Sequence, residues 1–172
     1  MGIRKIEASD MPAIEHFKVK EGSCENPIYY SIYLKERAIS YTAGGYELTF
    51  ALFNNTQTII GGYITLRVTS LIETYNDNEI YGNPALEILN LAVDERFTNR
   101  KFGTNLVTLA KSIANKIKKN YAGIQYILAL SDPKAIGFYE KEGFAIARSN
   151  YQAPKDIVTG NQDCELMVMK LN

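Results

Sequence analysis

The sequence predicts one domain, residues 1–172, of the α/β or α+β class with a partly parallel sheet. Its 172 residues, 46% of them hydrophobic, are enough to bury one sizeable core. Strand-like and helix-like apolar patterns are mixed along the chain, and strand-helix-strand units follow one another in the second half. Repeats, low-complexity segments and linkers are absent from the sequence, so no division into two domains is expected.

A strand and two helices are expected near the start of the chain. Residues 2–8 alternate like a short strand, and Ser9 or Asp10 can cap a following helix that runs through Pro12, Ile14 and Phe17. Pro27, preceded by a polar asparagine, is typical of a second helix start, because proline needs no N–H partner in the first turn. This second helix is expected to end near residues 44–45, which are both glycines.

A hairpin is expected next. Residues 46–53 and 58–71 are rich in β-branched and aromatic side chains and flank a polar turn. Gly61 and Gly62 interrupt the second strand, which suggests a bulge or a close backbone approach. Residues 72–84 are polar and contain asparagine, glycine and proline residues that interrupt regular structure, so they are expected to form a mobile loop.

The second half begins with the most apolar strand. Residues 85–93 lack polar alternation, which predicts a central strand buried on both faces. Apolar residues at helical spacing follow from Leu106 to Ile117 and predict a helix that packs by one side. The remaining expected elements are a buried strand at 123–130, a short helix at 132–143, and closing strands at 144–151 and 164–171.

Charge and cysteine usage limit the kinds of partner. Nineteen basic and nineteen acidic residues cancel, so no global field indicates a nucleic acid or a membrane. No segment reads as a signal peptide or approaches the roughly 20 apolar residues of a membrane span, so the cytoplasm is the expected location. Cys24 and Cys164 lack metal-site or redox spacing and are interpreted as ordinary thiols, and no metal is expected.

The turn after the central strand carries the first functional signal. In "LAVDERFTNRKFGTNLV", residues 91–107, a strand leads through a charged turn into a helix whose first N–H groups can bind an anion. Gly103 lets the backbone approach a ligand closely, and Arg96, Arg100 and Lys101 add positive charge around the turn. A phosphate group is therefore the expected ligand. The alternative is that Gly103 only eases the connection and that the basic residues are solvated.

Two segments resemble the GNAT superfamily, the acetyl-CoA-dependent N-acetyltransferases. "SDPKAIGFYEKEGF", residues 131–144, is similar to that family's segment "N..A..FYEK.GF", with Asp132 in the position of the usual asparagine. "VDERFTNRKFGTNLV" resembles its phosphate loop, which is Gln or Arg, two residues, Gly, one residue, then Gly or Ala. We align Thr98 with the Gln/Arg position, Lys101 with the first glycine and Gly103 with the last.

A second alignment of the loop starts from Arg100 and puts Gly103 on the first glycine and Asn105 on the last. The first alignment is preferred because it also matches "GTNLV" to the usual helix start. It makes the N–H groups from Arg100 to Thr104 the expected diphosphate cradle.

The resemblance implies a single α/β (α+β) domain with a mixed, mostly antiparallel, twisted sheet of six to seven strands, about four helices, and a splay between the fourth and fifth strands. It implies direct transfer of the acetyl group from acetyl-CoA to a primary amine in a ternary complex, without a metal. The coenzyme-binding residues that it implies are Leu91, Ala92, Val93, Thr98, Asn99, Arg100, Lys101, Phe102, Gly103, Thr104, Asp132, Ala135 and Phe138.

Two side chains are implied as catalytic. Tyr139 corresponds to the tyrosine that protonates the leaving thiolate, and a phenol with a pKa near 10 stays protonated at neutral pH. Glu87 resembles the glutamate base of histone-type relatives. The alternatives are that Tyr139 only packs on the sheet and that Glu87 is a structural hydrogen-bond acceptor. His16, the single histidine, is expected on the surface or at a helix cap.

The acceptor is left open as a small molecule, a peptide or a protein. "GSCENPIYYSIYLKERA" and "IIGGYITLRVTSL" resemble GNAT toxins that acetylate the amino group of aminoacyl-tRNA, and Lys111, Lys116, Lys118 and Lys119 add local positive charge. tRNA is therefore an alternative acceptor, although a net charge of zero opposes it. A non-catalytic CoA-binding or structural module is a third alternative, and a homodimer is a candidate assembly.

Overall fold

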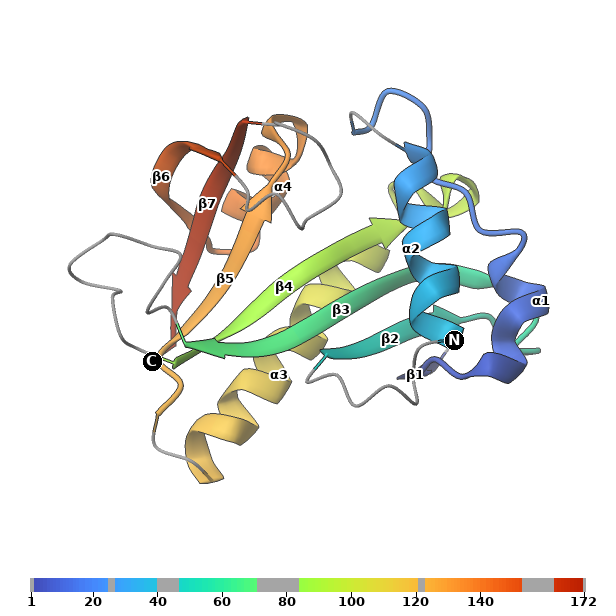
Figure 1. Ribbon diagram of the computed structural model, residues 1–172, viewed down its shortest axis with the longest axis horizontal. Coiled ribbons are helices and arrows are strands. Elements are labelled where there is room, and N and C mark those ends of the chain that lie inside the picture. Colours follow the sequence, from blue (N-terminus) through green and yellow to red (C-terminus); the bar gives the residue numbers. More distant parts are fainter. Residues whose placement is uncertain are drawn as a thin grey trace.

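The computed structural model describes residues 2–24, 27–39, 47–70, 84–120, 123–152 and 163–171. One seven-stranded sheet runs through the described part, in the order β1-β2-β3-β4-β5-β7-β6 (Figure 1). The strands are β1 (Gly2–Lys5), β2 (Glu47–Phe53), β3 (Ile60–Ser70), β4 (Pro84–Val93), β5 (Tyr126–Ser131), β6 (Ala145–Gln152) and β7 (Asp163–Lys170). Only β4 and β5 pair in parallel, so the sheet is mixed and mostly antiparallel, as predicted.

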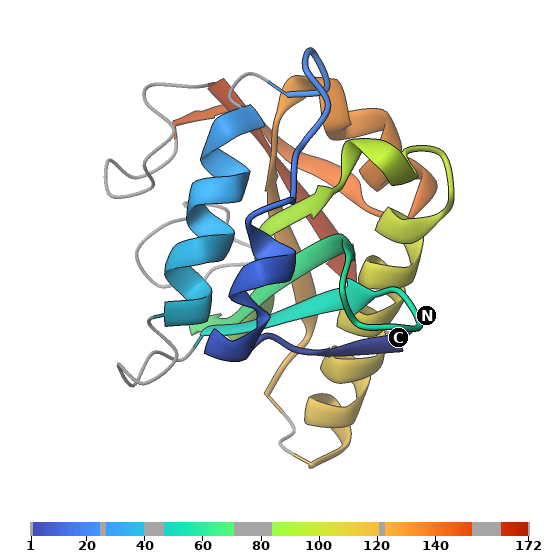
Figure 2. The ribbon, with the colours of Figure 1, turned by 90° about the vertical axis from the view of Figure 1, so that its right-hand side faces the viewer.

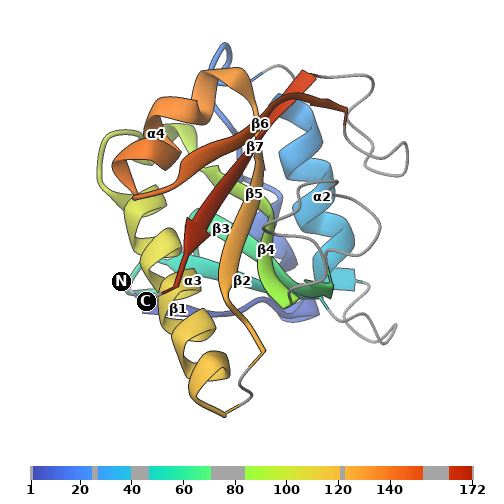
Figure 3. The ribbon, with the colours of Figure 1, turned by 90° about the vertical axis from the view of Figure 1, so that its left-hand side faces the viewer.

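Helices cover both faces of the sheet. They are α1 (Met11–Ile14), α2 (Pro27–Ile39), α3 (Phe102–Asn120) and α4 (Ile136–Lys141), with short 3-10 turns at Ala8–Asp10, Glu95–Phe97 and Pro133–Ala135. Figures 2 and 3 show α1 and α2 on one face and α3 and α4 on the other. No helix in the described ranges is long and apolar enough to span a bilayer.

Each face has its own buried cluster. Leu106, Val107 and Ala110 of α3 pack with Ile64 and Ile127 of the sheet. A second cluster joins α1 and α2 to β2 and β3. The amphipathic pattern of α3 therefore buries the predicted face, because its apolar residues recur every three or four positions.

The first helix is shorter than the sequence predicts. The Asp10 carboxylate forms an ion pair with Arg4 at 2.6 Å and accepts the Glu7 N–H at 2.9 Å. These contacts fix the first turn, which begins at Ala8. The α-helix ends at Ile14, and Phe17 follows in a tighter turn in which its N–H donates to the Ile14 carbonyl oxygen at 3.0 Å. By contrast, α2 begins at Pro27 as predicted, while its expected end near residues 44–45 and the expected loop at 72–84 fall outside the described residues, apart from Pro84.

The two strand glycines produce both features that the sequence suggested. The β2–β3 register shifts between Leu52 and Phe53, opposite Gly61, which marks a bulge. A Cβ atom on Gly61 would lie 2.5 Å from the Phe102 ring, and one on Gly62 would lie 3.0 Å from the Ala92 carbonyl oxygen. Larger residues at either position would push β3 away from α3 or β4.

A second bulge and a short pairing open the sheet beside β4. The β3–β4 register shifts between Thr65 and Leu66, which leaves Leu89 as an extra residue on β4. The parallel pairing of β4 with β5 covers Ala85–Ile88 and stops there. Beyond Ile88 the two strands separate, which is the predicted splay between the fourth and fifth strands (Figure 1).

Candidate active site

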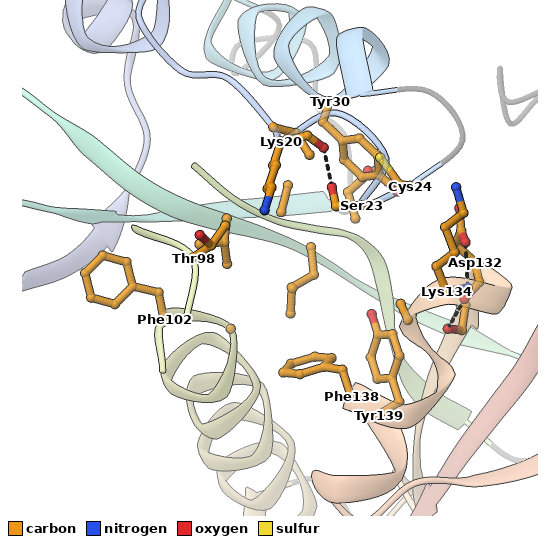
Figure 4. Close-up of a pocket in the computed structure, with 18 of the residues that line it drawn as sticks. Lys20, Ser23, Cys24, Tyr30, Thr98, Phe102, Asp132, Lys134, Phe138 and Tyr139 are labelled. Atoms are coloured by element: carbon orange, nitrogen blue, oxygen red, sulfur yellow. Dashed lines mark hydrogen bonds between the residues drawn. The ribbon is translucent and has the colours of Figure 1, made fainter. Parts of the chain in front are cut away.

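A pocket of about 430 Å³ lies where β4 and β5 separate. Its size is typical of a small-molecule site. The pocket is lined by all of the predicted coenzyme-binding residues except Arg100, namely Leu91, Ala92, Val93, Thr98, Asn99, Lys101, Phe102, Gly103, Thr104, Asp132, Ala135 and Phe138, and by Tyr139. Figure 4 shows labelled residues of the lining that converge from the loop and start of α3, from the turn after β5 and from α4.

The backbone of β4 offers hydrogen-bonding groups to the pocket. Asp94 donates its N–H to the Gly61 carbonyl oxygen at 3.0 Å, and Ala92 lies opposite Tyr63 in the same antiparallel ladder. Because main-chain groups alternate in direction along such a ladder, those of Leu91 and Val93 point away from β3. They face the side on which β5 has separated, and no β5 residue is paired with them.

The loop before α3 has an unusual backbone. Asn99 has a φ of 65° and Lys101 a φ of 60°, the left-handed region that glycine adopts most readily. Lys101 stands where our first alignment puts the loop's first glycine. The conformation is therefore one that a glycine favours, although this chain has a lysine there.

The first turn of α3 supplies free N–H donors to the pocket. The helix begins at Phe102, and its first turn closes with the Asn105 N–H donating to the Lys101 carbonyl oxygen at 2.9 Å. The N–H groups that precede Asn105 have no intrahelical acceptor. Arg100 is the exception among the predicted donors, because its N–H donates to Phe97 at 3.3 Å and the residue lies outside the pocket lining.

Tyr139 lies on α4 with its phenol directed into the pocket (Figure 4). Its side chain is 6% exposed and packs edge-on against Phe138 and Phe144, with centroid distances of 5.2 and 5.3 Å. Burial raises the pKa of the Tyr139 phenol, because charge is poorly solvated there. The phenol therefore stays a proton donor at neutral pH.

Polar contacts fix α4 against the start of α3. The Thr104 hydroxyl donates to the Glu142 carboxylate at 2.6 Å, and the Lys111 ammonium donates to the Glu142 carbonyl oxygen at 2.7 Å. Glu142 follows α4 directly and belongs to the "FYEKEGF" segment. The two helices that carry Gly103 and Tyr139 are thus held together by side chains of that segment.

Glu87 lies outside the pocket lining. It is 4% exposed, and its Oε2 accepts hydrogen bonds from Arg67 at 2.8 and 3.2 Å. Arg67 also contacts Glu47 at 3.8 Å, and Glu47 forms an ion pair with Arg37 of α2. This row of alternating charges joins α2 to β2, β3 and β4.

One wall of the pocket was not predicted from the sequence. Val19, Lys20, Ser23 and Cys24, from the segment between α1 and α2, line it together with Tyr30 of α2. Figure 4 shows Lys20, Ser23, Cys24 and Tyr30 opposite Phe138 and Tyr139. Ser23, Cys24 and Tyr30 belong to the stretch "GSCENPIYYSIYLKERA" that resembles GNAT toxins, but no local motif marks Val19 or Lys20.

Several other expected groups are accounted for by contacts within the described chain. Arg96 forms an ion pair with the buried Asp94 at 2.6 Å, so its charge is already engaged. Neither Cys24 nor Cys164 forms a disulfide in the part of the chain that the structure describes, and His16 is exposed. No group of three or more histidine, cysteine or acidic side chains that could hold a metal occurs among the described residues.

Solved structures share this fold at low sequence identity. The toxin AtaT, as a tyrosine-to-phenylalanine mutant bound to the C-terminus of the antitoxin AtaR and acetyl-CoA, has a TM-score of 0.72 at 16% identity, over 98% of this chain and 92% of that chain. AtaT complexed with acetyl-methionyl-tRNAfMet has a TM-score of 0.70 at 15% identity, over 95% and 92%. NAA60 of Arabidopsis thaliana, in complex with a bisubstrate analogue, has a TM-score of 0.65 at 16% identity, over 99% and 98%.

Sequence comparison gives the family. No curated protein matches the chain significantly. The acetyltransferase (GNAT) domain family matches residues 45–146, which include the loop before α3 and the "FYEKEGF" segment. With more than half of the chain matched, this protein belongs to the GNAT acetyltransferase family.

Proposed function

We propose that this protein transfers an acetyl group from acetyl-CoA to a primary amine by direct attack in a ternary complex. The observation that carries the proposal is one pocket that joins the first turn of α3, the exposed backbone of β4 and the buried phenol of Tyr139. The acceptor is an amine of a small molecule, a peptide or a protein.

The donor set of the pocket fits acetyl-CoA. Free N–H groups at a helix start suit a diphosphate, and Lys101 adds a positive charge beside them. The backbone of Leu91 and Val93 has donors and acceptors that suit the amides of a pantetheine arm. Asp132 caps the turn before α4 by accepting the Lys134 N–H at 2.8 Å, which keeps this side of the pocket polar.

Acetyl-CoA, when bound, supplies an activated thioester. Tyr139 donates its phenolic proton to the sulfur that leaves, and a backbone N–H of β4 stabilises negative charge on the carbonyl oxygen. One well-aimed donor of that kind contributes about 3–4 kcal/mol to the barrier reduction. The raised pKa of Tyr139 means that the phenol carries its proton at neutral pH.

Glu87 stays our candidate base, although it is paired with Arg67 and does not line the pocket. Arg67 donates to the Glu87 carboxylate at 2.8 Å, so the carboxylate already has a partner that it would share with an amine or a water. Glu87 would act on the amine through intervening groups, because the residue lies outside the pocket lining. Water is the alternative base.

The test is release of free thiol from acetyl-CoA in the presence of a broad panel of primary amines. We expect amine-dependent release by the wild-type protein and a loss of about 100-fold with Tyr139→Phe. Tight binding of acetyl-CoA without turnover of any amine would instead support a non-catalytic CoA-binding module.

A second candidate acceptor is aminoacyl-tRNA. It is favoured by the similarity to AtaT, which has been solved with acetyl-methionyl-tRNAfMet. Lys116, Lys119 and Arg100 are exposed on or beside α3, but Lys111 and Lys118 already donate to Glu142 and Leu171 carbonyl oxygens. Translation in a cell-free system should then stop when both protein and acetyl-CoA are added, and continued translation would exclude this acceptor.

A further inference from the structure

The pocket carries more positive charge than the chain as a whole. Among the described residues, Lys20, Lys101 and Lys134 line it, whereas Asp132 is the one carboxylate in its lining. Within the described ranges, none of the three ammonium groups takes part in an ion pair or a side-chain hydrogen bond. The excess is local, because the formal net charge of the chain is zero.

The segment that carries Lys20 is anchored to the end of β4. Val19 forms an antiparallel bridge with Asp94, and the Lys18 N–H donates to the Asp94 carboxylate at 3.1 Å. The Glu95 N–H returns a hydrogen bond to the Lys18 carbonyl oxygen at 2.8 Å. Asp94 is fully buried, so this connection is shielded from water.

A tight turn then fixes the direction of the chain after Lys20. The Ser23 hydroxyl donates to the Lys20 carbonyl oxygen at 2.6 Å, and Gly22 has a φ of 76°. The side chain of Lys20 extends from this turn into the pocket, toward the side on which Thr98 lies (Figure 4). Lys20 and the loop before α3 therefore face the same space from two walls.

The two arginines of the loop before α3 do not supply a positive charge to the pocket. Arg96 is engaged by Asp94, and Arg100 lies outside the pocket lining. Lys101 is then the one cation from the loop itself that lines the pocket. The Asp94 anchor holds Lys20 beside the point where β4 enters the loop, instead of near Tyr139 on α4.

We propose that Lys20 is a further coenzyme-binding residue, which holds the diphosphate of acetyl-CoA against the first turn of α3 from the opposite wall. The proposal rests on the proposed function, since it needs acetyl-CoA as the ligand. It assigns to the N-terminal segment a part in coenzyme binding, in addition to any contact with the acceptor. A lysine suits this role because its ammonium is a mobile point charge with three donors.

The test is calorimetric titration of wild type and Lys20→Ala with three ligands. Acetyl-CoA and 3′-dephospho-acetyl-CoA both contain the diphosphate, and S-acetylpantetheine, measured by competition, contains no phosphate. We expect Lys20→Ala to weaken the first two by about tenfold each, the scale of one charge-assisted contact, and to leave S-acetylpantetheine unchanged. Lys20→Arg should retain most of the affinity.

Lys35→Ala is the matched control, because Lys35 is exposed on α2 and does not line the pocket. It should leave all three affinities unchanged. Equal affinity of Lys20→Ala and wild type for acetyl-CoA would overturn the assignment, as would an equal loss for S-acetylpantetheine. A loss confined to acetyl-CoA would move Lys20 to the 3′-phosphate and overturn the diphosphate contact. If the wild-type protein does not bind acetyl-CoA, the proposed function is wrong, and the assignment of Lys20 is overturned with it.

Discussion

The ring of Phe138 on α4 lies 3.1 Å from the position that a Cβ atom on Gly103 would occupy. A glycine at the start of α3 therefore lets α4 approach that helix closely. The residue after Phe138 is Tyr139, so this approach also determines where the phenol lies. A change at Gly103 affects both the N–H donors of α3 and the position of the proposed acid.

Gly103→Val should weaken acetyl-CoA binding by at least tenfold and lower the free energy of unfolding by about 1–3 kcal/mol, because the side chain overpacks against Phe138. Gly137→Ala is the control, since a Cβ there meets nothing within 4 Å. Calorimetry and thermal unfolding measure both effects. Unchanged affinity in Gly103→Val would mean that the α3 start does not bind the coenzyme.

Lys101→Gly should be more stable than Lys101→Ala by about 1 kcal/mol, because only glycine adopts a φ of 60° without steric cost. Both variants remove the ammonium, so the comparison isolates the backbone conformation. Denaturant unfolding of the two variants measures it. Equal stabilities would show that the loop does not hold Lys101 in the left-handed region in solution.

Stability should fall in alkaline solution because of buried phenols. Burial raises the pKa of Tyr139 and of Tyr63, while the unfolded chain ionises near pH 10. The folded state then binds more protons than the unfolded state above that pH, so the free energy of unfolding decreases by up to about 1.4 kcal/mol per pH unit for each phenol. This contribution is fully present below pH 10.

Tyr139→Phe provides the check on that pH dependence. In this variant the free energy of unfolding should fall less steeply above pH 10, by up to about 1.4 kcal/mol per pH unit, and should change little at neutral pH. An identical decline in the variant would indicate that Tyr139 ionises freely in the folded state. The same variant should keep its acetyl-CoA affinity while acetyl transfer slows, which separates the chemical step from binding.

Glu87→Gln tests the base and the ion pair together. If Glu87 is the base, the variant loses activity mainly on the acidic side of the pH–rate profile, where the amine is protonated and needs a base to remove its proton. If Glu87 only pairs with Arg67, the profile keeps its shape and the free energy of unfolding falls. Arg67→Gln is the companion variant, since it breaks the same pair and leaves the carboxylate.

The parts of the site that could be predicted from sequence lie in continuous segments. The loop before α3 and the turn into α4 bring Gly103 and Tyr139 to one pocket, and each was found from residues that are neighbours in the chain. Pro27 marked the start of α2 because a helix start depends on local backbone chemistry. Local patterns were sufficient for these features.

The parts that were missed depend on contacts between distant residues. Lys20 reaches the pocket through Lys18 and Asp94, which are 76 positions apart. Arg67 faces Glu87 because the bulge at Leu89 shifts the β3–β4 register by one residue. A sequence gives neither the bulge nor the register, so the ion pair at the candidate base was not foreseen.

The most direct test of the account is calorimetric titration of the wild-type protein with acetyl-CoA. We expect one site with a Kd on the order of micromolar, and a loss of binding in Gly103→Val that Gly137→Ala does not show. If a folded wild-type protein does not bind acetyl-CoA, the pocket between β4 and β5 is not a coenzyme site.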